Sequence, residues 1–285
     1  MWLTGISASE SKNTCCCEYS RSRLPFVVFV SFLSREMAMH GTQRVTPELL
    51  LKAYAQGVFP MAAKRDNPAI YWLSPDNRGI IPLEQIHVPR RLARTIRRDR
   101  FRVTIDTAFE DIIRGCATPA PGREETWINA EIIALYSELH RRKSAHSLEV
   151  WHESKLVGGL YGISLGAAFF GESMFSWERD ASKVAFVHLA ARLIAGGYEL
   201  LDAQFLTEHL AQFGAVSISR ADYLRRLARS MTKQANFYCP EPSGSSGAAS
   251  LAPMSGEVSL TGAVDATTGA TWPGWLVLQL ITHKS

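Results

Sequence analysis

The chain has 285 residues, of which 46% are hydrophobic and 20% charged, and a formal net charge of +4. It is long enough to bury a sizeable core, and so mild a charge does not by itself indicate a nucleic-acid partner. The five cysteines have neither a disulfide pattern nor metal-ligand spacing, which excludes a disulfide framework and favours a reducing, cytoplasmic location. No apolar run reaches the length of about 20 residues that spans a bilayer.

Residues 1–38 have no patterned apolar face. Their one apolar run, LPFVVFVSFL, follows arginines but lacks the small-residue cleavage site of a signal peptide. Met37 and Met39 lie just before the first well-patterned helix. We therefore predict that residues 1–38 are a disordered extension, or that the true start codon lies after most of them.

Residues 39–105 are predicted to form a small N-terminal α/β domain. Its helix, TPELLLKAYAQG, has Thr46 as the N-cap, Pro47 as the first helical residue and Gly57 as the stop. Loop and strand segments rich in aromatic and turn residues follow, VFPMA and IYWLSPDNRGIIPL, and then the strand FRVTI.

Basic residues gather in two segments. Seven arginines and a single acid, Asp99, lie between Arg90 and Arg102, and a second cluster follows between Arg220 and Lys233. Patches of this kind suit the backbone of a polyanion, but two solvated helix faces explain them equally well. The sequence alone leaves both explanations open.

Residues 106–235 are predicted to form a larger mixed-sheet domain. Residues 145–175 have the pattern of an antiparallel hairpin whose turn is Glu153-Ser154-Lys155. A helix, SKVAFVHLAARLIA, leads to the buried strand YELLDAQF and then to the basic helix YLRRLARSM.

Residues 236–285 are predicted to be a low-complexity tail. Residues 240–269 are rich in Ser, Gly, Ala and Pro and have too few large apolar side chains to become ordered. Near the end, WLVLQLI indicates a terminal strand that packs back on the body.

Glu172 follows directly after an apolar run in GGLYGISLGAAFFGESMF. Burial disfavours its charged form, so this acid must be paired, neutral or facing a cavity. It either caps the following turn, with Ser173 and Ser176 as partners, or belongs to a functional site.

Asp202 and Gln204 are two residues apart in LLDAQF, so both side chains leave one face of a strand. An acid and an amide on an otherwise apolar strand can orient a substrate amine or carbonyl. A satisfied buried hydrogen-bond network is the alternative.

Four aromatic residues also allow two interpretations. They are core side chains or, in a chain with basic patches, surfaces on which a nucleotide base stacks. These residues are Phe59, Tyr71, Trp72 and Trp127.

Taken together, these stretches resemble the bacterial leucyl/phenylalanyl-tRNA–protein transferases. The matching segments run in the family's order from about Thr46 to Leu227, and several are long and unusual. They include AYAQGVFPMA, IYWLSPDNRGIIPL, FRVTIDTAFEDIIRGCA, LVGGLYGISLGAAFFGESMFS and GGYELLDAQF. The first 38 residues and the tail after Lys233 depart from the commonest family pattern.

The resemblance implies an aminoacyltransferase. Such an enzyme moves leucine or phenylalanine, less readily methionine, from leucyl-tRNA or phenylalanyl-tRNA to the N-terminal Arg or Lys of a protein, which marks that protein for degradation. The implied fold class is α+β, with a small N-terminal domain and a larger acetyltransferase-like (GNAT-type) domain. No metal or cofactor is implied, and we expect a monomer.

The resemblance also implies roles for individual residues. Glu172 matches the acid thought to hold the basic N-terminal residue of the acceptor, and Asp202 with Gln204 matches the polar pair at the reacting centre. Whether Asp202 is a base or only orients the amine stays open. Trp72 and Trp127 would meet the terminal adenosine of the tRNA.

Further positions would contact other parts of the aminoacyl-tRNA. The apolar pocket for the amino-acid side chain is implied at Leu160, Phe169 and Leu201, with Gly158 and Gly159 allowing close approach. Arginines of the first basic segment would bind the tRNA backbone, and these are Arg90, Arg94 and Arg97.

Two other classes of protein fit the sequence less well. An acyl-CoA-dependent N-acetyltransferase would need the loop R/Q-x-x-G-x-G/A before a helix, which we do not find. A tRNA-binding or adaptor module without enzymatic activity would have no need to combine Glu172, Asp202 and Gln204.

Overall fold

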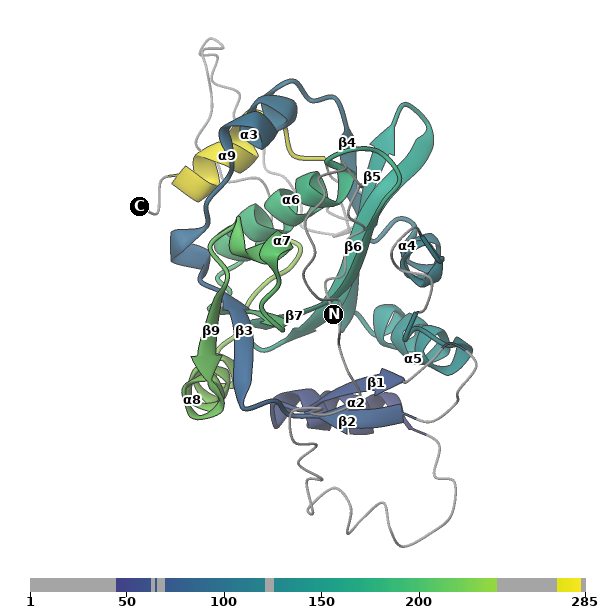
Figure 1. The fold of residues 1–285 in the computed structure, drawn as a ribbon, viewed down its shortest axis with the longest axis vertical. Helices are drawn as coiled ribbons and strands as arrows, with labels where there is room; N and C mark the ends of the chain where they lie inside the picture. Colours follow the sequence, from purple (N-terminus) through teal and green to yellow (C-terminus); the bar gives the residue numbers. More distant parts are fainter. Residues whose placement is uncertain (1–44, 63–64, 66–69, 121–125, 240–270, 283–285) are drawn as a thin grey trace, which may run out of the picture.

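The computed structural model describes residues 45–62, 65, 70–120, 126–239 and 271–282. The predictions for residues 1–38 and 240–269 concern segments outside these ranges. The described chain is mixed α/β, with a two-stranded sheet and an open seven-stranded sheet flanked by helices (Figure 1). No helix in this part of the chain is long and apolar enough to cross a membrane.

The seven-stranded sheet has the order β4-β5-β6-β7-β8-β3-β9. Neighbouring strands are antiparallel except β7 and β8, which are parallel because helix α6 returns the chain between them. The bounds are β3 Asn77–Ile81, β4 Arg102–Ile105, β5 Ala145–His152, β6 Lys155–Leu165, β7 Ala168–Ser176, β8 Leu200–Gln204 and β9 Val216–Ser219.

Helices cover both faces of this sheet. Helix α6 (Ala181–Ala195) lies on one face, and α4 (Phe109–Ala117) and α5 (Ala130–Arg141) lie on the other (Figure 1). Thirteen of the 15 residues of α6 are buried, because α3 (Arg90–Arg97) and α9 (Gly274–Thr282) pack over its outer side.

Helix α9 corrects the prediction of a terminal strand. The segment WLVLQLI is helical and buries Leu276, Val277, Leu278 and Ile281 in the core that α6 covers. A short run of apolar residues has no periodicity that separates a buried helix from a strand. Contact with α3 and α6 decides the conformation here.

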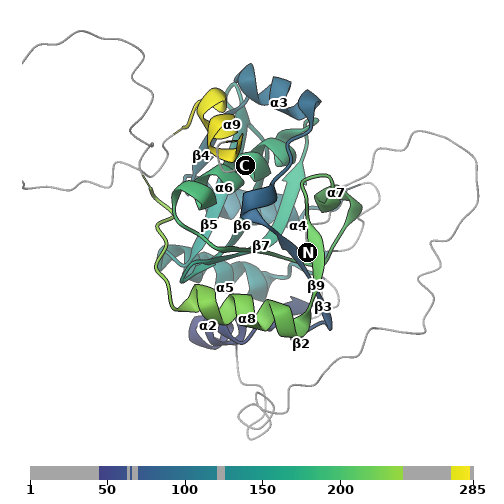
Figure 2. The same cartoon turned by 90° about the vertical axis from the view of Figure 1, so that its left-hand side faces the viewer.

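Another group of elements lies toward one end of the sheet. They are α2 (Pro47–Ala55), the hairpin of β1 (Phe59–Ala62) and β2 (Ile70–Leu73), and α8 (Arg220–Met231) (Figure 2). Thr46 caps α2 as predicted, since its Oγ1 accepts from the Leu49 N–H at 3.2 Å. Two short helices complete the described part, η1 (Leu83–Gln85) and α7 (Glu208–Ala211).

Strands β3 and β4 come from the segment predicted as a separate N-terminal domain, yet both belong to the large sheet. Strand β3 is inserted between β8 and β9 and pairs antiparallel with each. Among the described strands only β1 and β2 form a sheet of their own. The boundary predicted near residue 105 therefore does not separate two sheets. The insertion of β3 places its side chains beside those of β8.

Candidate active site

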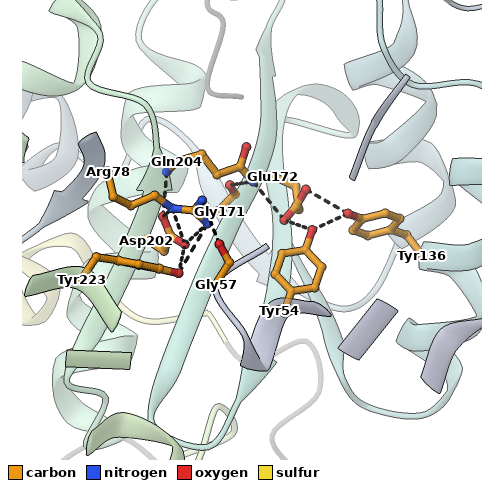
Figure 3. Close-up of polar contacts among 9 residues, drawn as sticks. All are labelled: Tyr54, Gly57, Arg78, Tyr136, Gly171, Glu172, Asp202, Gln204 and Tyr223. Atoms are coloured by element: carbon orange, nitrogen blue, oxygen red, sulfur yellow. Dashed lines mark hydrogen bonds and ion pairs between the residues drawn. The ribbon is translucent and has the colours of Figure 1, made fainter. Parts of the chain in front are cut away.

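The polar residues singled out in the sequence come together where β7 and β8 stop pairing. The final residue pair between these strands is Phe170–Asp202. Beyond it, the side-chain amide of Gln204 donates to the Gly171 carbonyl and to Glu172 Oε1, each at 3.3 Å (Figure 3). The backbone N–H of Gln204 donates to Asp202 Oδ1 at 2.8 Å. Gln204 therefore links the two acids.

Glu172 is fully buried and accepts hydrogen bonds from two phenols (Figure 3). Tyr54 of α2 donates to Oε1 at 2.6 Å, and Tyr136 of α5 donates to Oε2 at 3.0 Å. Burial raises the pKa of Glu172, while the two phenol hydrogen bonds act in the opposite direction. Ser176, one of the turn partners considered from the sequence, instead donates to the Glu178 carbonyl at 2.7 Å.

The two phenols remain protonated over the ordinary pH range. Burial and the neighbouring Glu172 charge raise the pKa values of Tyr54 and Tyr136 well above the usual range. Both side chains therefore act as hydrogen-bond donors to the carboxylate.

Asp202 forms a bidentate ion pair with Arg78 of β3. Arg78 Nη2 lies 2.6 Å from Oδ2 and Nε lies 3.0 Å from Oδ1, and the two side chains are 1% and 0% exposed. Tyr223 of α8 donates to Oδ2 at 2.7 Å. Burial alone would lower the pKa of Arg78, but the Asp202 carboxylate and the neighbouring phenols together outweigh it, and the net shift is upward. The guanidinium therefore stays charged inside the protein.

The residues expected to form the aminoacyl pocket lie in the other layer. Leu160, Phe169 and Leu201 are fully buried in the core cluster that α6 covers, whereas the phenols that contact the acids belong to the cluster on the opposite face. Phe169 stacks on Phe237 with ring centroids 5.7 Å apart. These three side chains are fully packed by the protein itself.

The two glycines expected at that pocket lie in β6 and allow close packing within the fold. A Cβ at Gly158 would lie 2.7 Å from the Ala181 Cβ, and a Cβ at Gly159 would lie 2.5 Å from the Leu148 carbonyl oxygen. The missing side chains let α6 and β5 approach β6.

The aromatic residues divide between core and surface. Trp127 is buried in the same core cluster as the phenols, and Trp72 is partly buried and packs against that cluster. The Trp72 Nε1 is buried and has no hydrogen-bond partner in the described part of the chain. Phe59 is core and lies under the Arg78 guanidinium, 4.3 Å from it, whereas Tyr71 is half exposed.

Arg90, Arg94 and Arg97 lie together on the exposed side of α3, while Leu92 and Ile96 face the core. They line a groove of about 520 Å³ between α3 and α9. Helix α3 and the β1–β2 hairpin lie toward opposite ends of the molecule (Figures 1 and 2). The predicted basic face therefore exists on α3, at the other end of the molecule from the hairpin.

Four residues of the site were not singled out in the sequence. Tyr54, Tyr136 and Tyr223 occupy inward positions of helices, where a phenol is usually an ordinary core residue. Arg78 could have been found as the single charged residue of the strand segment NRGII, in which the residues after Arg78 are all buried. A buried arginine requires a partner.

This arrangement suits a reaction between an amine and an activated carbonyl. A buried carboxylate can hold a cation, and an amide with fixed orientation can contact an amine or a developing oxyanion. Among the contacts described here, no serine, threonine or cysteine side chain pairs with a base as a nucleophile would.

Comparison with known proteins identifies the family. The model described as Leucyl/phenylalanyl-tRNA protein transferase matches residues 80–228, and the model of that family's N-terminal domain matches residues 43–76. The leucyl/phenylalanyl-tRNA–protein transferase of Maricaulis maris is 64% identical over 190 residues, which is 67% of this chain and 88% of the relative. That of Phenylobacterium zucineum is 54% identical over 236 residues, covering 83% and 96%. The chain belongs to the leucyl/phenylalanyl-tRNA protein transferase family.

Proposed function

We propose that the protein transfers leucine or phenylalanine, less readily methionine, from aminoacyl-tRNA to the N-terminal Arg or Lys of an acceptor protein. The observation that carries the proposal is the link that Gln204 makes between Asp202 and Glu172 where the parallel strands β7 and β8 stop pairing. Family membership supports the same reaction, because the relatives are named for it. The new N-terminal residue would mark the acceptor for degradation.

The reaction joins an amine to an ester that is already activated. The α-amine of the acceptor forms a C–N bond with the aminoacyl carbonyl carbon, the C–O bond to the tRNA ribose breaks, and the amine proton ends on the leaving ribose oxygen. No covalent intermediate with the protein is needed, so catalysis consists of positioning the amine and stabilising the oxyanion. We assign the contact with the amine to Gln204, which Asp202 holds.

We assign Glu172 to the cationic side chain of the acceptor. Burial raises the pKa of this carboxyl, because the charged form is destabilised away from water. A guanidinium or ammonium group that arrives beside the carboxylate would stabilise that charged form. A charge-assisted hydrogen bond of this kind would select Arg and Lys over neutral N-terminal residues.

The tRNA is proposed to bind over a wider surface. Trp72 and Trp127 would contact the terminal adenosine, and the Trp72 N–H, which has no partner among the described residues, supports this role. Arginines on the exposed side of α3 would bind the backbone. These arginines are Arg90, Arg94 and Arg97.

The apolar cluster under α6 is proposed to receive the amino-acid side chain. Leu160, Phe169 and Leu201 present only hydrocarbon, which favours Leu and Phe over polar side chains. Because these residues are fully packed, the incoming side chain must displace neighbouring groups.

The acetyltransferase-like (GNAT-type) fold is also part of the proposal. Its support is the antiparallel run β4-β5-β6-β7 followed by the parallel β7–β8 pair, joined through α6. We further propose that the protein acts as a monomer in the cytoplasm, where charged tRNAs occur.

A transfer assay tests this function. The purified protein is mixed with leucyl-tRNA labelled in the leucine and with a peptide that begins with Arg, and label is followed in the peptide. The expected result is transfer to this peptide and none to its N-acetylated form. Acetyl transfer from acetyl-CoA without leucyl transfer would indicate an acetyltransferase, and tRNA binding without transfer would indicate a binding module.

A further inference from the structure

We propose that Arg78 is a positioning residue for the transfer: through its ion pair with Asp202 it holds Gln204 in the conformation that the reaction uses. The inference rests on the proposed function. It also gives Asp202 the task of orienting Gln204, in place of accepting a proton from the amine.

The first step is that the hydrogen-bonding sites of Asp202 are full (Figure 3). Oδ1 accepts from Arg78 Nε at 3.0 Å and from the Gln204 N–H at 2.8 Å. Oδ2 accepts from Arg78 Nη2 at 2.6 Å and from the Tyr223 hydroxyl at 2.7 Å. A carboxylate offers about four acceptor sites, so these donors leave none for an amine. Asp202 can therefore influence the substrate only through a neighbour.

The second step is that this neighbour has a strained backbone. Gln204 has a φ of 64°, a left-handed conformation that is unfavourable for a residue other than glycine. The Asp202 carboxylate offsets that cost by accepting the Gln204 N–H, and the next N–H, of Phe205, donates to Ala203 O at 2.7 Å. The tight turn directs the Gln204 amide toward Gly171 and Glu172.

The third step is that Arg78 is itself fixed. Its guanidinium lies between the rings of Phe59 and Tyr223, 4.3 and 4.6 Å from the two centroids. A planar fork held in this way presents two donors to a carboxylate in a single orientation. Its donors contact the Asp202 carboxylate, the Gly57 carbonyl and the Tyr223 hydroxyl, so its effect on a substrate passes through Asp202.

The strand that carries Arg78 also lies against the turn it controls. Gly79 pairs with Gln204, and a Cβ on Gly79 would lie 2.5 Å from the Phe205 carbonyl carbon. Buried ion pairs contribute little net stability compared with apolar residues of the same volume. Orientation of Gln204 is a function that an apolar pair could not provide.

The experiment compares Arg78→Gln, Arg78→Lys and a control, Arg114→Gln, an exposed arginine of α4. Leucyl transfer to an Arg-ended peptide is measured as kcat and as KM for each substrate. For Arg78→Gln we expect kcat to fall about 10²-fold, the size of effect that a small misplacement causes, with both KM values within about threefold. The kcat of Arg78→Lys should be about tenfold higher than that of Arg78→Gln. Lysine keeps the positive charge, but it lacks the planar fork and so restores the rate only in part. Arg114→Gln should match wild type.

Amide hydrogen exchange supplies a readout that a merely stabilising role would not change. In folded Arg78→Gln the Gln204 amide should exchange faster than in wild type, while the amide of Leu201 in the same strand keeps its protection. If Arg78→Gln does not fold, Arg78→Lys decides: a kcat about tenfold below wild type, with faster exchange at Gln204, supports the proposal.

Three results would overturn the inference. The first is a kcat within about threefold of wild type in folded Arg78→Gln or, where that variant does not fold, in Arg78→Lys. The second is a loss of activity confined to KM. The third is unchanged hydrogen exchange of the Gln204 amide. Absence of leucyl transfer by the wild-type protein would instead refute the proposed function. The exchange measurement would still show whether Arg78 holds Gln204.

Discussion

The phenolic oxygen of Tyr54 lies 2.6 Å from Oε1 of Glu172, although the residues are 118 positions apart in the chain. Tyr136 closes a triangle, 3.0 Å from Glu172 Oε2 and 2.6 Å from the Tyr54 oxygen. Two phenols supply two protons for these three short contacts. A third proton, on the Glu172 carboxyl, would make all three contacts hydrogen bonds, so the cluster accommodates either form of this acid.

Acceptor binding should therefore depend on the ionisation of Glu172. Burial raises its pKa, so the neutral acid persists at pH values where an exposed glutamate would be charged. As the pH falls through this raised pKa, the carboxylate loses its charge and the affinity for an Arg-ended peptide should fall. The groups that face it are Tyr54, Tyr136, Tyr161, Asp202 and Gln204. Calorimetric titration between about pH 5 and pH 8 measures this dependence.

Glu172→Gln should remove that dependence while keeping the shape of the side chain. Loss of a charge-assisted hydrogen bond, worth about 1.5–3 kcal/mol, should weaken binding of the Arg-ended peptide by roughly 10- to 100-fold. Glu178→Gln is the control, because Glu178 is a partly exposed acid paired with Arg100. If both variants bound the peptide as wild type does, Glu172 would not be the acceptor site.

Reversal of the arginines on α3 should weaken tRNA binding whatever amino acid is attached. The triple variant Arg90→Glu, Arg94→Glu, Arg97→Glu should bind more weakly, and its affinity should depend less on salt. Removal of one phosphate contact reduces the slope of log K against log salt by about 0.7–0.9. Filter binding across a series of salt concentrations measures this slope.

The control for that experiment has the same net charge. It reverses three exposed arginines outside α3, namely Arg114, Arg141 and Arg179. An equal loss of affinity in both triple variants would indicate a general charge effect in place of a binding face.

Gly79→Ala should disturb the site by steric contact alone. The added Cβ would lie 2.5 Å from the Phe205 carbonyl carbon and 2.6 Å from the Leu206 nitrogen, both backbone atoms. The turn at Gln204 must move, so stability should fall by about 1–3 kcal/mol and leucyl transfer by about 10²-fold. Urea unfolding and the transfer assay measure the two effects.

Gly197→Ala separates strain from position. Gly197 has a φ of 78° and no atom within 4 Å of the added Cβ, so alanine there costs about 1 kcal/mol by strain at the end of α6. Its transfer rate should match wild type. A similar drop in rate for both alanine variants would mean that the Gly79 effect is only a loss of stability.

His188 should make the fold sensitive to mild acid. Burial, with the neighbouring Arg192 cation, lowers its pKa to about 3, whereas in the unfolded chain it titrates near 6.5. Below about pH 6.5 the unfolded state binds the extra proton, so stability is lost as the pH falls, by about 1.4 kcal/mol per unit. His188→Asn should flatten this slope between about pH 6 and pH 4 relative to the wild-type protein. Equal slopes in urea unfolding would contradict this assignment.

Local signals predicted much of the fold. The Thr46-Pro47 cap of α2 and the hairpin turn at Glu153 are confirmed, because each depends on residues close in the chain. Strand β8 and helix α8 follow the apolar pattern of their own segments. The prediction of a strand at α9 was wrong. Contact with α3 and α6 determines the conformation of this segment, and the local sequence does not report that contact.

The site was predictable only in part. Glu172, Asp202 and Gln204 stood out as polar residues in apolar strands, and the structure brings them together. The partner of Asp202 is 124 positions away, and the pairing follows from the insertion of β3 between β8 and β9. No local pattern in the sequence reports that sheet order, so Arg78 stayed unassigned.

The most direct test of the account is single-turnover leucyl transfer by Gln204→Ala beside Gln212→Ala. Gln204 is the residue proposed to contact the amine, while Gln212 caps α7 and donates to the His209 carbonyl at 2.6 Å. The account predicts a rate at least about 10²-fold below wild type for Gln204→Ala, with unchanged affinity for leucyl-tRNA, and a wild-type rate for Gln212→Ala. A Gln204→Ala protein that transfers leucine as fast as Gln212→Ala would contradict it.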